Sequence, residues 1–235
     1  MADAPTIDFA HLPHSAPVPS ETRDQAIADP GFGSLFTDHM VTIAFDADRV
    51  ERGENGWHDA KLCPREPIAL DPAAAVLHYA QEIFEGMKAY RHEDGSVWTF
   101  RPEKNAARFR NSARRLALPE LSDEDFVGSL KALLAQDSAW VPTPASVSDE
   151  CSLYLRPFMI ASETFLGVRP SKEVDYYVIA SPAAAYFKGG VKPVSIWLSS
   201  NYKRAAPGGT GFAKCGGNYA ASLAAPKEAE THGCD

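Results

Sequence analysis

A single lysine surrounded by glycines is the residue whose setting most strongly indicates chemistry. Residues 204–219 read Arg-Ala-Ala-Pro-Gly-Gly-Thr-Gly-Phe-Ala-Lys-Cys-Gly-Gly-Asn-Tyr, with the lysine at position 214. Glycine adopts backbone angles that other residues avoid, and it lets a bulky ligand approach the main chain. A lysine in a tight, desolvated loop loses its charge readily and can form an imine with an aldehyde. The spacing alone leaves open a solvated lysine in a flexible loop.

Two other glycine signatures are excluded. A phosphate-cradling P-loop needs Gly before Lys and Ser or Thr after it, but Ala213 and Cys215 occupy those places. The dinucleotide-binding fingerprint fails because Lys214 stands where its third glycine belongs. A formal net charge of -8 also argues against a partner with a phosphate backbone. We therefore expect neither a nucleotide-binding loop nor a nucleic-acid partner.

Composition is typical of a globular protein. With 235 residues, 45% of them hydrophobic, the chain can fill one large core or two modest ones. No apolar stretch approaches the length of a membrane span, and the proline-containing first residues predict a surface arm rather than a signal peptide. The cysteines have neither C-x-x-C spacing nor metal-site spacing, which predicts free thiols and a cytoplasmic location; they are Cys63, Cys151, Cys215 and Cys234.

The elements that must position the lysine alternate between strand and helix patterns, which predicts a mixed α and β fold. Strands are expected at residues 39–45, 87–90, 97–100, 152–160, 176–181 and 194–198. Helices are expected from Asp71-Pro72 through the apolar stretch containing Tyr79 and Phe84, over 102–116 and 122–134, and from Tyr219 onward. The pair Asp94-Gly95 predicts a tight hairpin turn with positive φ angles.

The helix that begins at Pro102 has an apolar stripe, because small or aromatic residues recur every three or four positions. These are Ala106, Phe109, Ala113 and Leu116. Its arginines must then point away from the core. The next helix begins with Ser122 and Asp125, an acidic variant of the capping box.

Residues 208–219 resemble the lysine motif of branched-chain aminotransferases, which belong to the class IV (fold type IV) enzymes that use pyridoxal 5'-phosphate (PLP). Other stretches resemble the same family in order, at 32–40, 77–80, 83–90, 153–157, 165–168, 185–187 and 204–207. The likeness is greatest to the actinobacterial type of enzyme. It implies an α+β fold with an arm (1–30), a small N-terminal α/β domain (31–187), a linker at 188–190 with a hinge at Gly189-Gly190, and the start of a large domain (191–235).

The resemblance implies four cofactor-binding residues. Lys214 would bind PLP covalently and move a proton between substrate and cofactor. Tyr219 would hydrogen-bond the cofactor's phenolic oxygen, and Arg108 would bind its phosphate. Arg204 would support the site.

A substrate pocket is implied beside them. Alternation along the strand places Tyr154 and Arg156 on one face, opposite the two leucines. The pocket would hold the side chain of leucine, isoleucine or valine and, in the other half-reaction, the carboxylate of glutamate or 2-oxoglutarate. The aromatic residues of its wall, each of which taken singly could be an ordinary core residue, are Phe32, Tyr79, Phe84 and Tyr186.

The implied activity is ping-pong transfer of the amino group between L-leucine, L-isoleucine or L-valine and 2-oxoglutarate. Family members continue well beyond residue 235, so we expect a truncated large domain and no turnover by this chain alone. A homodimer is expected for the full-length protein, with residues 165–168 as the loop that completes the partner's site. Alternatives are a non-catalytic remnant or interaction module, a D-amino-acid aminotransferase and an aminodeoxychorismate lyase.

Overall fold

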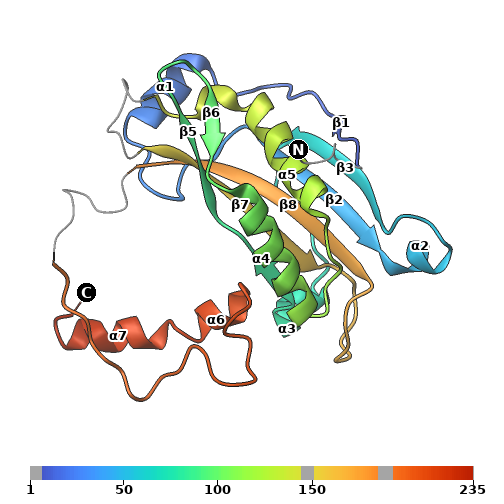
Figure 1. The fold of residues 1–235 in the computed structure, drawn as a ribbon, viewed down its shortest axis with the longest axis vertical. Coiled ribbons are helices and arrows are strands. Elements are labelled where there is room, and N and C mark those ends of the chain that lie inside the picture. Colours follow the sequence, from blue (N-terminus) through green and yellow to red (C-terminus); the bar gives the residue numbers. More distant parts are fainter. Residues whose placement is uncertain (1–6, 144–150, 185–192, 235) are drawn as a thin grey trace.

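The computed structural model describes residues 7–143, 151–184 and 193–234. Its centre is an eight-stranded, mostly antiparallel sheet with the order β1-β3-β2-β8-β7-β5-β6, and β4 pairs with β7 off this path (Figure 1). The strands are β1 (Ala10–His11), β2 (His39–Asp46), β3 (Trp57–Pro64), β4 (Glu82–Phe84), β5 (Met87–Arg91), β6 (Val97–Thr99), β7 (Ser152–Ala161) and β8 (Glu173–Ala183).

Two long helices cover one face of this sheet (Figure 1). They are α4 (Pro102–Arg115) and α5 (Asp123–Gln136); of the expected stripe, Ala106, Phe109 and Ala113 are buried, and Leu116, just after α4, is partly buried. Phe109 of α4 and Phe126 of α5 pack on Tyr176 of β8, with ring centroids 5.7 and 6.3 Å away. The shorter helices are α1 (Ser20–Ala28), α2 (Ala47–Glu51), α3 (Ala75–Tyr79) and the 3-10 helix η1 (Ser138–Trp140).

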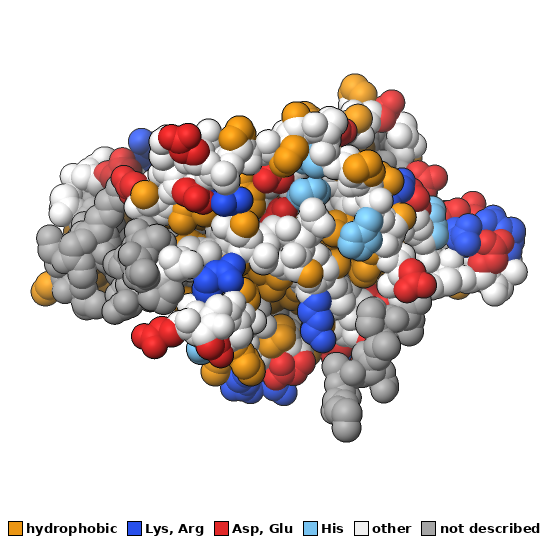
Figure 2. Space-filling view, turned by 90° about the horizontal axis from the view of Figure 1, so that it is seen from above, with side chains coloured by type: hydrophobic (Ala, Val, Ile, Leu, Met, Phe, Trp, Pro, Cys, Tyr) orange, Lys and Arg blue, Asp and Glu red, His pale blue; other side chains and the backbone are white. Residues whose placement is uncertain are grey.

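The opposite face of the sheet is more open. Along β7, Leu153 and Leu155 are fully buried beneath the helices, whereas Tyr154 and Arg156 are half-buried on the other side. The predicted alternation is therefore confirmed. On the outer surface drawn in Figure 2, acidic, basic and hydrophobic side chains are interspersed.

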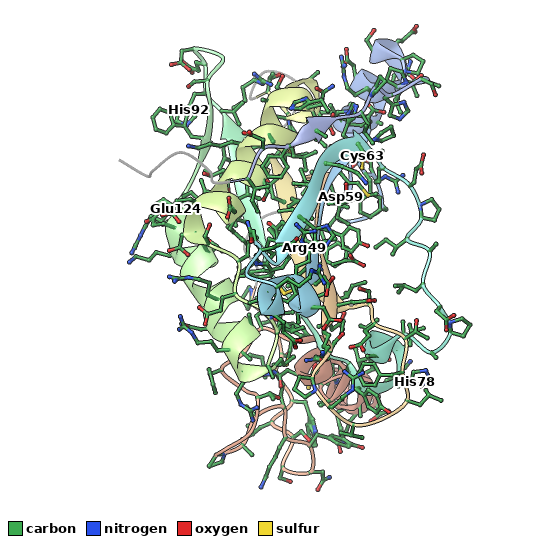
Figure 3. All side chains as sticks on the ribbon, turned by 90° about the vertical axis from the view of Figure 1, so that its right-hand side faces the viewer. Arg49, Asp59, Cys63, His78, His92 and Glu124 are labelled. Carbon is green, nitrogen blue, oxygen red and sulfur yellow. The ribbon has the colours of Figure 1, made fainter. Side chains whose placement is uncertain are left out.

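The C-terminal segment carries the glycine-rich loop, α6 (Gly216–Ala220) and α7 (Ala224–Thr231). It lies against the ends of α3 and α4 (Figure 1), and Figure 3 shows it next to α3, which carries the labelled His78. Two hydrogen bonds of the Lys214 main chain help to attach it. Lys214 N donates to the side-chain oxygen Ser112 Oγ (2.9 Å), and Lys214 O accepts from Phe84 N (3.0 Å). The described helices include none long and apolar enough to cross a membrane.

Most expected elements are confirmed, and the hairpin is one of them, although only Gly95 adopts a positive φ (83°). The capping box is also confirmed, because Ser122 Oγ accepts from Asp125 N at 3.0 Å. Cys63, Cys215 and Cys234 are free thiols, as expected. The arm is partly structured, because β1 pairs with β3 and α1 follows it.

Three expected elements were wrong. The helix expected through Phe84 ends at Tyr79, because Ala80 adopts a left-handed φ of 47° and Phe84 pairs with Phe158 in β4. Residues 194–198 form no strand, since no described strand lies beside them to pair with, and Leu198 is 90% exposed. The helix expected from Tyr219 is divided into α6 and α7. The expected linker at 188–190, with its hinge, lies outside the described residues.

Candidate active site

Lys214 has its backbone fixed on both sides. The hydroxyl of Ser112, which is fully buried on α4, accepts from Lys214 N and donates to Arg108 O. The carbonyl of Lys214 accepts from Phe84 N at the end of β4. Asn218 closes the loop, because its side-chain Nδ2 donates a hydrogen bond to Ala213 O at 2.8 Å. These bonds hold the lysine at the junction of α4, β4 and α6.

The side chain of Lys214 lies among aromatic groups. Its Nζ donates to Tyr219 Oη at 2.6 Å and lies 4.4 Å from the centroid of the Phe84 ring. The rings of Phe84 and Tyr219 are themselves 4.9 Å apart. Lys214 is nevertheless only half-buried in the described chain, so the desolvation expected for it is not found there. The amine is positioned, but water still reaches it.

Arg156 continues the row of aromatic contacts away from the lysine. Its guanidinium lies 4.7 Å from the Phe84 ring centroid, and its Nη2 donates to Tyr154 Oη at 3.1 Å. Phe32 packs on Tyr154 with ring centroids 5.4 Å apart. Phe32, Tyr154 and Arg156 line a cavity of about 220 Å³ with Ile179 as one of its apolar walls. The Nε of Arg156 is buried without a hydrogen-bond partner among the described residues.

Arg108 is held by a residue to which the sequence analysis gave no role. Its Nε and Nη2 donate to the two carboxylate oxygens of Glu85, at 2.5 and 2.8 Å. Glu85 is fully buried, whereas half of the Arg108 side chain (52%) stays exposed. The hydrogen bonds to Glu85 raise the pKa of Arg108 against the opposing effect of burial, and the phenols of Tyr219 and Tyr154 add to the rise. Arg108 therefore lies near the two tyrosines of the same site.

A second carboxylate contacts the lysine loop. A Cβ at Gly216 would lie 1.9 Å from Glu82 Oε1, so the Glu82 side chain lies directly against the backbone of the loop. Burial raises the pKa of Glu82 above its usual range, because the charged form loses hydration. The described residues contain no cluster of side chains suited to a metal ion.

Two other residues expected at the site are not brought into it, and a third is not described by the structure. Tyr79 points toward the loop after β7, where its hydroxyl donates to Leu166 O and its ring stacks on Phe165. Arg204 is exposed and has no hydrogen bond to the described part of the chain. Tyr186 lies outside the described residues. The structure thus assembles Lys214, Tyr219 and Phe84 with neighbouring Arg108, Tyr154, Arg156 and Phe32.

Comparison with known proteins finds aminotransferases that are similar in sequence and in structure. The branched-chain-amino-acid aminotransferase of Mycolicibacterium smegmatis is 58% identical over 229 residues, which are 97% of this chain and 60% of that protein. A branched-chain aminotransferase from Thermoproteus uzoniensis, solved with norvaline, superposes with a TM-score of 0.61 at 20% identity over 83% of this chain and 58% of that one. An aminotransferase from Brucella abortus bound to PLP gives 0.54 at 20% identity, over 83% and 60%.

These solved structures share the fold, and the chain spans about 60% of the length of the curated relatives that it matches. The family model described as amino-transferase class IV matches residues 82–235, which are more than half of the sequence. The chain therefore belongs to the class IV aminotransferases.

Proposed function

We propose that this chain supplies the lysine and substrate pocket of a PLP-dependent branched-chain-amino-acid transaminase. The reaction transfers the amino group between L-leucine, L-isoleucine or L-valine and 2-oxoglutarate. One observation carries the proposal: Lys214 Nζ is hydrogen-bonded to Tyr219 Oη beneath the Phe84 ring, and Arg156 lies on the same ring. The name of the Mycolicibacterium smegmatis relative supports this assignment.

The residues present fit PLP. A lysine amine and a phenol 2.6 Å apart suit its aldehyde and its phenolic oxygen. Arg108 keeps half of its side chain exposed while two of its donors are fixed by Glu85, so the remaining donors are free to bind a phosphate. Lys214, Tyr219 and Arg108 would therefore hold the cofactor.

Each residue has a physical task in the reaction. When bound, PLP supplies an electron sink that acidifies the α-carbon of the substrate. Lys214 Nζ takes that proton as general base and returns it as general acid. Tyr219 accepts a hydrogen bond from Nζ and so limits the positions from which the amine can reach its target. Phe84 covers one side of the amine with an apolar surface.

The pocket beyond Phe84 fits two kinds of substrate. Phe32 and Ile179 offer apolar walls to a branched side chain. Arg156 lines the same cavity, and its guanidinium suits the side-chain carboxylate of glutamate or 2-oxoglutarate. Stacking on Phe84 and Tyr154 keeps this cation beside aromatic rings, and no carboxylate of the described residues pairs with it.

We also propose a homodimer in which the loop after β7 completes the partner's site. The loop is anchored, because Phe165 N donates to Ala73 O and Arg169 pairs with Glu163. Its tip presents Leu166 (66% exposed) and Val168 (90% exposed) to solvent. Free thiols at Cys63, Cys215 and Cys234 support a cytoplasmic location. We propose residues 31–187 and 191–235 as the limits of the small and the large domain.

The test uses borohydride reduction in the presence of PLP, followed by peptide mass spectrometry. It is run on this chain and on the same chain joined to the remaining residues of the Mycolicibacterium smegmatis relative. In the joined protein we expect the pyridoxyl group on Lys214 and transamination of L-leucine with 2-oxoglutarate, whereas this chain alone should show no stable label. Lys214→Ala should abolish both, whereas Lys227→Ala, which changes an exposed lysine, should change neither. Labelling elsewhere, or activity with D-alanine and none with L-leucine, would refute the proposal.

A further inference from the structure

Glu85 is a charged residue at a position where a folded protein rarely places one. It is 0% exposed, in the two-residue connection between β4 and β5, where its N–H donates to Pro157 O of β7 at 2.8 Å. Its carboxylate accepts from Arg108, from Asn105 Nδ2 at 2.8 Å and from Gly86 N at 3.2 Å. Burial of a carboxylate is costly unless it is paired and hydrogen-bonded. The ion pair with Arg108 and the hydrogen bonds from Asn105 and Gly86 meet both conditions.

The two partners of this ion pair are unequally exposed. Glu85 is closed off from solvent, whereas 52% of the Arg108 side chain remains accessible. A guanidinium has five N–H donors, and Glu85 takes the Nε donor and one of those on Nη2. Both Nη1 donors and the second Nη2 donor are left for another acceptor. A buried, bidentate carboxylate therefore fixes one edge of the guanidinium and leaves the other edge available.

A purely stabilising ion pair on the same helix looks different. Arg114 and Glu120 also form a bidentate contact, with Nε–Oε1 and Nη2–Oε2 distances of 2.6 and 2.7 Å. Both of those side chains are exposed, at 55% and 39%, as is usual for ion pairs at a protein surface. Arg108 lies one and a half turns earlier, and the Lys214 loop is attached to the same stretch of α4 through Ser112. Among the ion pairs of the described residues, only that of Glu85 combines a buried acid with a half-exposed arginine beside the lysine.

We propose that Glu85 is a positioning residue, which orients the Arg108 guanidinium so that its free donors bind the phosphate of PLP. The inference rests on the proposed function, because it assumes the phosphate as ligand. Without Glu85, the long side chain of Arg108 would sample many rotamers. Binding of the phosphate would then have to restrict these rotamers, at a cost in conformational entropy. Asn105 serves the same arrangement by bonding Glu85 Oε2 and Gly86 O.

The experiment compares PLP with pyridoxal, which has the same aldehyde and ring but no phosphate. Absorbance titrations of the joined protein described above give a Kd for each compound with the wild-type sequence, Glu85→Gln, Glu85→Ala and the matched control Glu120→Ala. Loss of a positioned, charge-assisted contact predicts that the preference for PLP over pyridoxal falls roughly tenfold or more in Glu85→Ala. We expect pyridoxal affinity to be unchanged, Glu85→Gln to retain part of the preference, and Glu120→Ala to retain all of it.

A spectroscopic readout reports on the arginine without any cofactor. The Nε–H proton of Arg108 should exchange slowly with water in the wild type and in Glu120→Ala, and rapidly in Glu85→Ala, as measured by nitrogen-15 NMR. Circular dichroism and a urea unfolding curve identify any variant that has lost its fold, and Glu85→Gln then replaces it as the decisive variant.

The outcomes separate the two proposals. If the wild type prefers PLP and Glu85→Ala keeps that preference, the positioning role is wrong and the proposed function stands. If the wild type shows no preference for PLP and borohydride leaves Lys214 unlabelled, the proposed function fails and this inference fails with it. Equal loss of PLP and pyridoxal affinity in folded Glu85→Ala would also overturn the inference, because it would indicate a general structural effect.

Discussion

Substitution of Ser112 by alanine tests how the lysine loop is held against the sheet-covering helix. The Ser112 hydroxyl is fully buried and accepts from Lys214 N at 2.9 Å. It also donates to Arg108 O at 3.0 Å, but that carbonyl lies inside α4 and keeps its helical partner in the variant. The substitution therefore leaves one backbone N–H, that of Lys214, without its acceptor.

The expected cost follows from that single unsatisfied donor. A buried donor without an acceptor costs about 1–3 kcal/mol, and the partial exposure of Lys214 places this case at about 1–2 kcal/mol. For a chain of this size, such a loss lowers the melting temperature by about 2–8 °C. Exchange of the Lys214 amide proton should accelerate by roughly tenfold, the factor that corresponds to about 1.4 kcal/mol.

Urea unfolding and amide hydrogen exchange measure the two effects separately. Ser222→Ala is the matched control, because that exposed hydroxyl also donates to a backbone carbonyl, Tyr219 O, yet accepts from no other group in the described chain. The control should stay within about 0.5 kcal/mol of the wild type. Unchanged stability of Ser112→Ala, together with unchanged exchange at Lys214, would refute the view that this hydroxyl anchors the loop.

Three further predictions concern other parts of the site and sheet. Gly86→Ala places a Cβ 1.9 Å from Tyr154 Oη, so the ring must move, and we expect a loss of about 1–3 kcal/mol in urea unfolding. Burial raises the pKa of Asp175, so its stability contribution is largest below the ordinary value of 3.8 and falls as pH rises through the folded-state pKa. Asp175→Asn should therefore unfold at higher urea than the wild type at pH 7, and the difference should shrink toward acid pH. Tyr219→Phe should lower the yield of borohydride-trapped PLP on Lys214 of the joined protein while changing stability by less than about 0.5 kcal/mol, since Tyr219 is 43% exposed.

Local periodicity predicted those elements whose residues are fixed by one buried face. The stripe of α4 and the alternation of β7 follow from the helix and strand repeats, and both are buried as expected. Residues 194–198 have the same apolar character but no neighbouring strand in the described chain. A strand depends on a partner for its backbone hydrogen bonds, and sequence periodicity contains no information about whether that partner is present.

The site residues divide in a similar way. Arg156 and Tyr154 could be placed together from alternation, because they are two positions apart on one strand. Tyr79 was expected in the aromatic wall, but the left-handed Ala80 ends α3 and directs the ring to Phe165. Such a turn depends on tertiary contacts, and alanine has no preference for positive φ that would have indicated it.

The alternation of buried residues also runs through Glu85, and it could have been used to predict that this carboxylate needs a partner. Ile83, Glu85, Met87 and Ala89 lie two residues apart and are all buried. A carboxylate in that series must be neutralised, since an unpaired buried charge would unfold the strand pair. The pattern thus demands a cation, but nearby candidates include Lys88 on the same strand and several arginines of the following helix. Only the packing of α4 against β4 brings Arg108 to the carboxylate, and therefore the need for a partner was predictable while its identity was not.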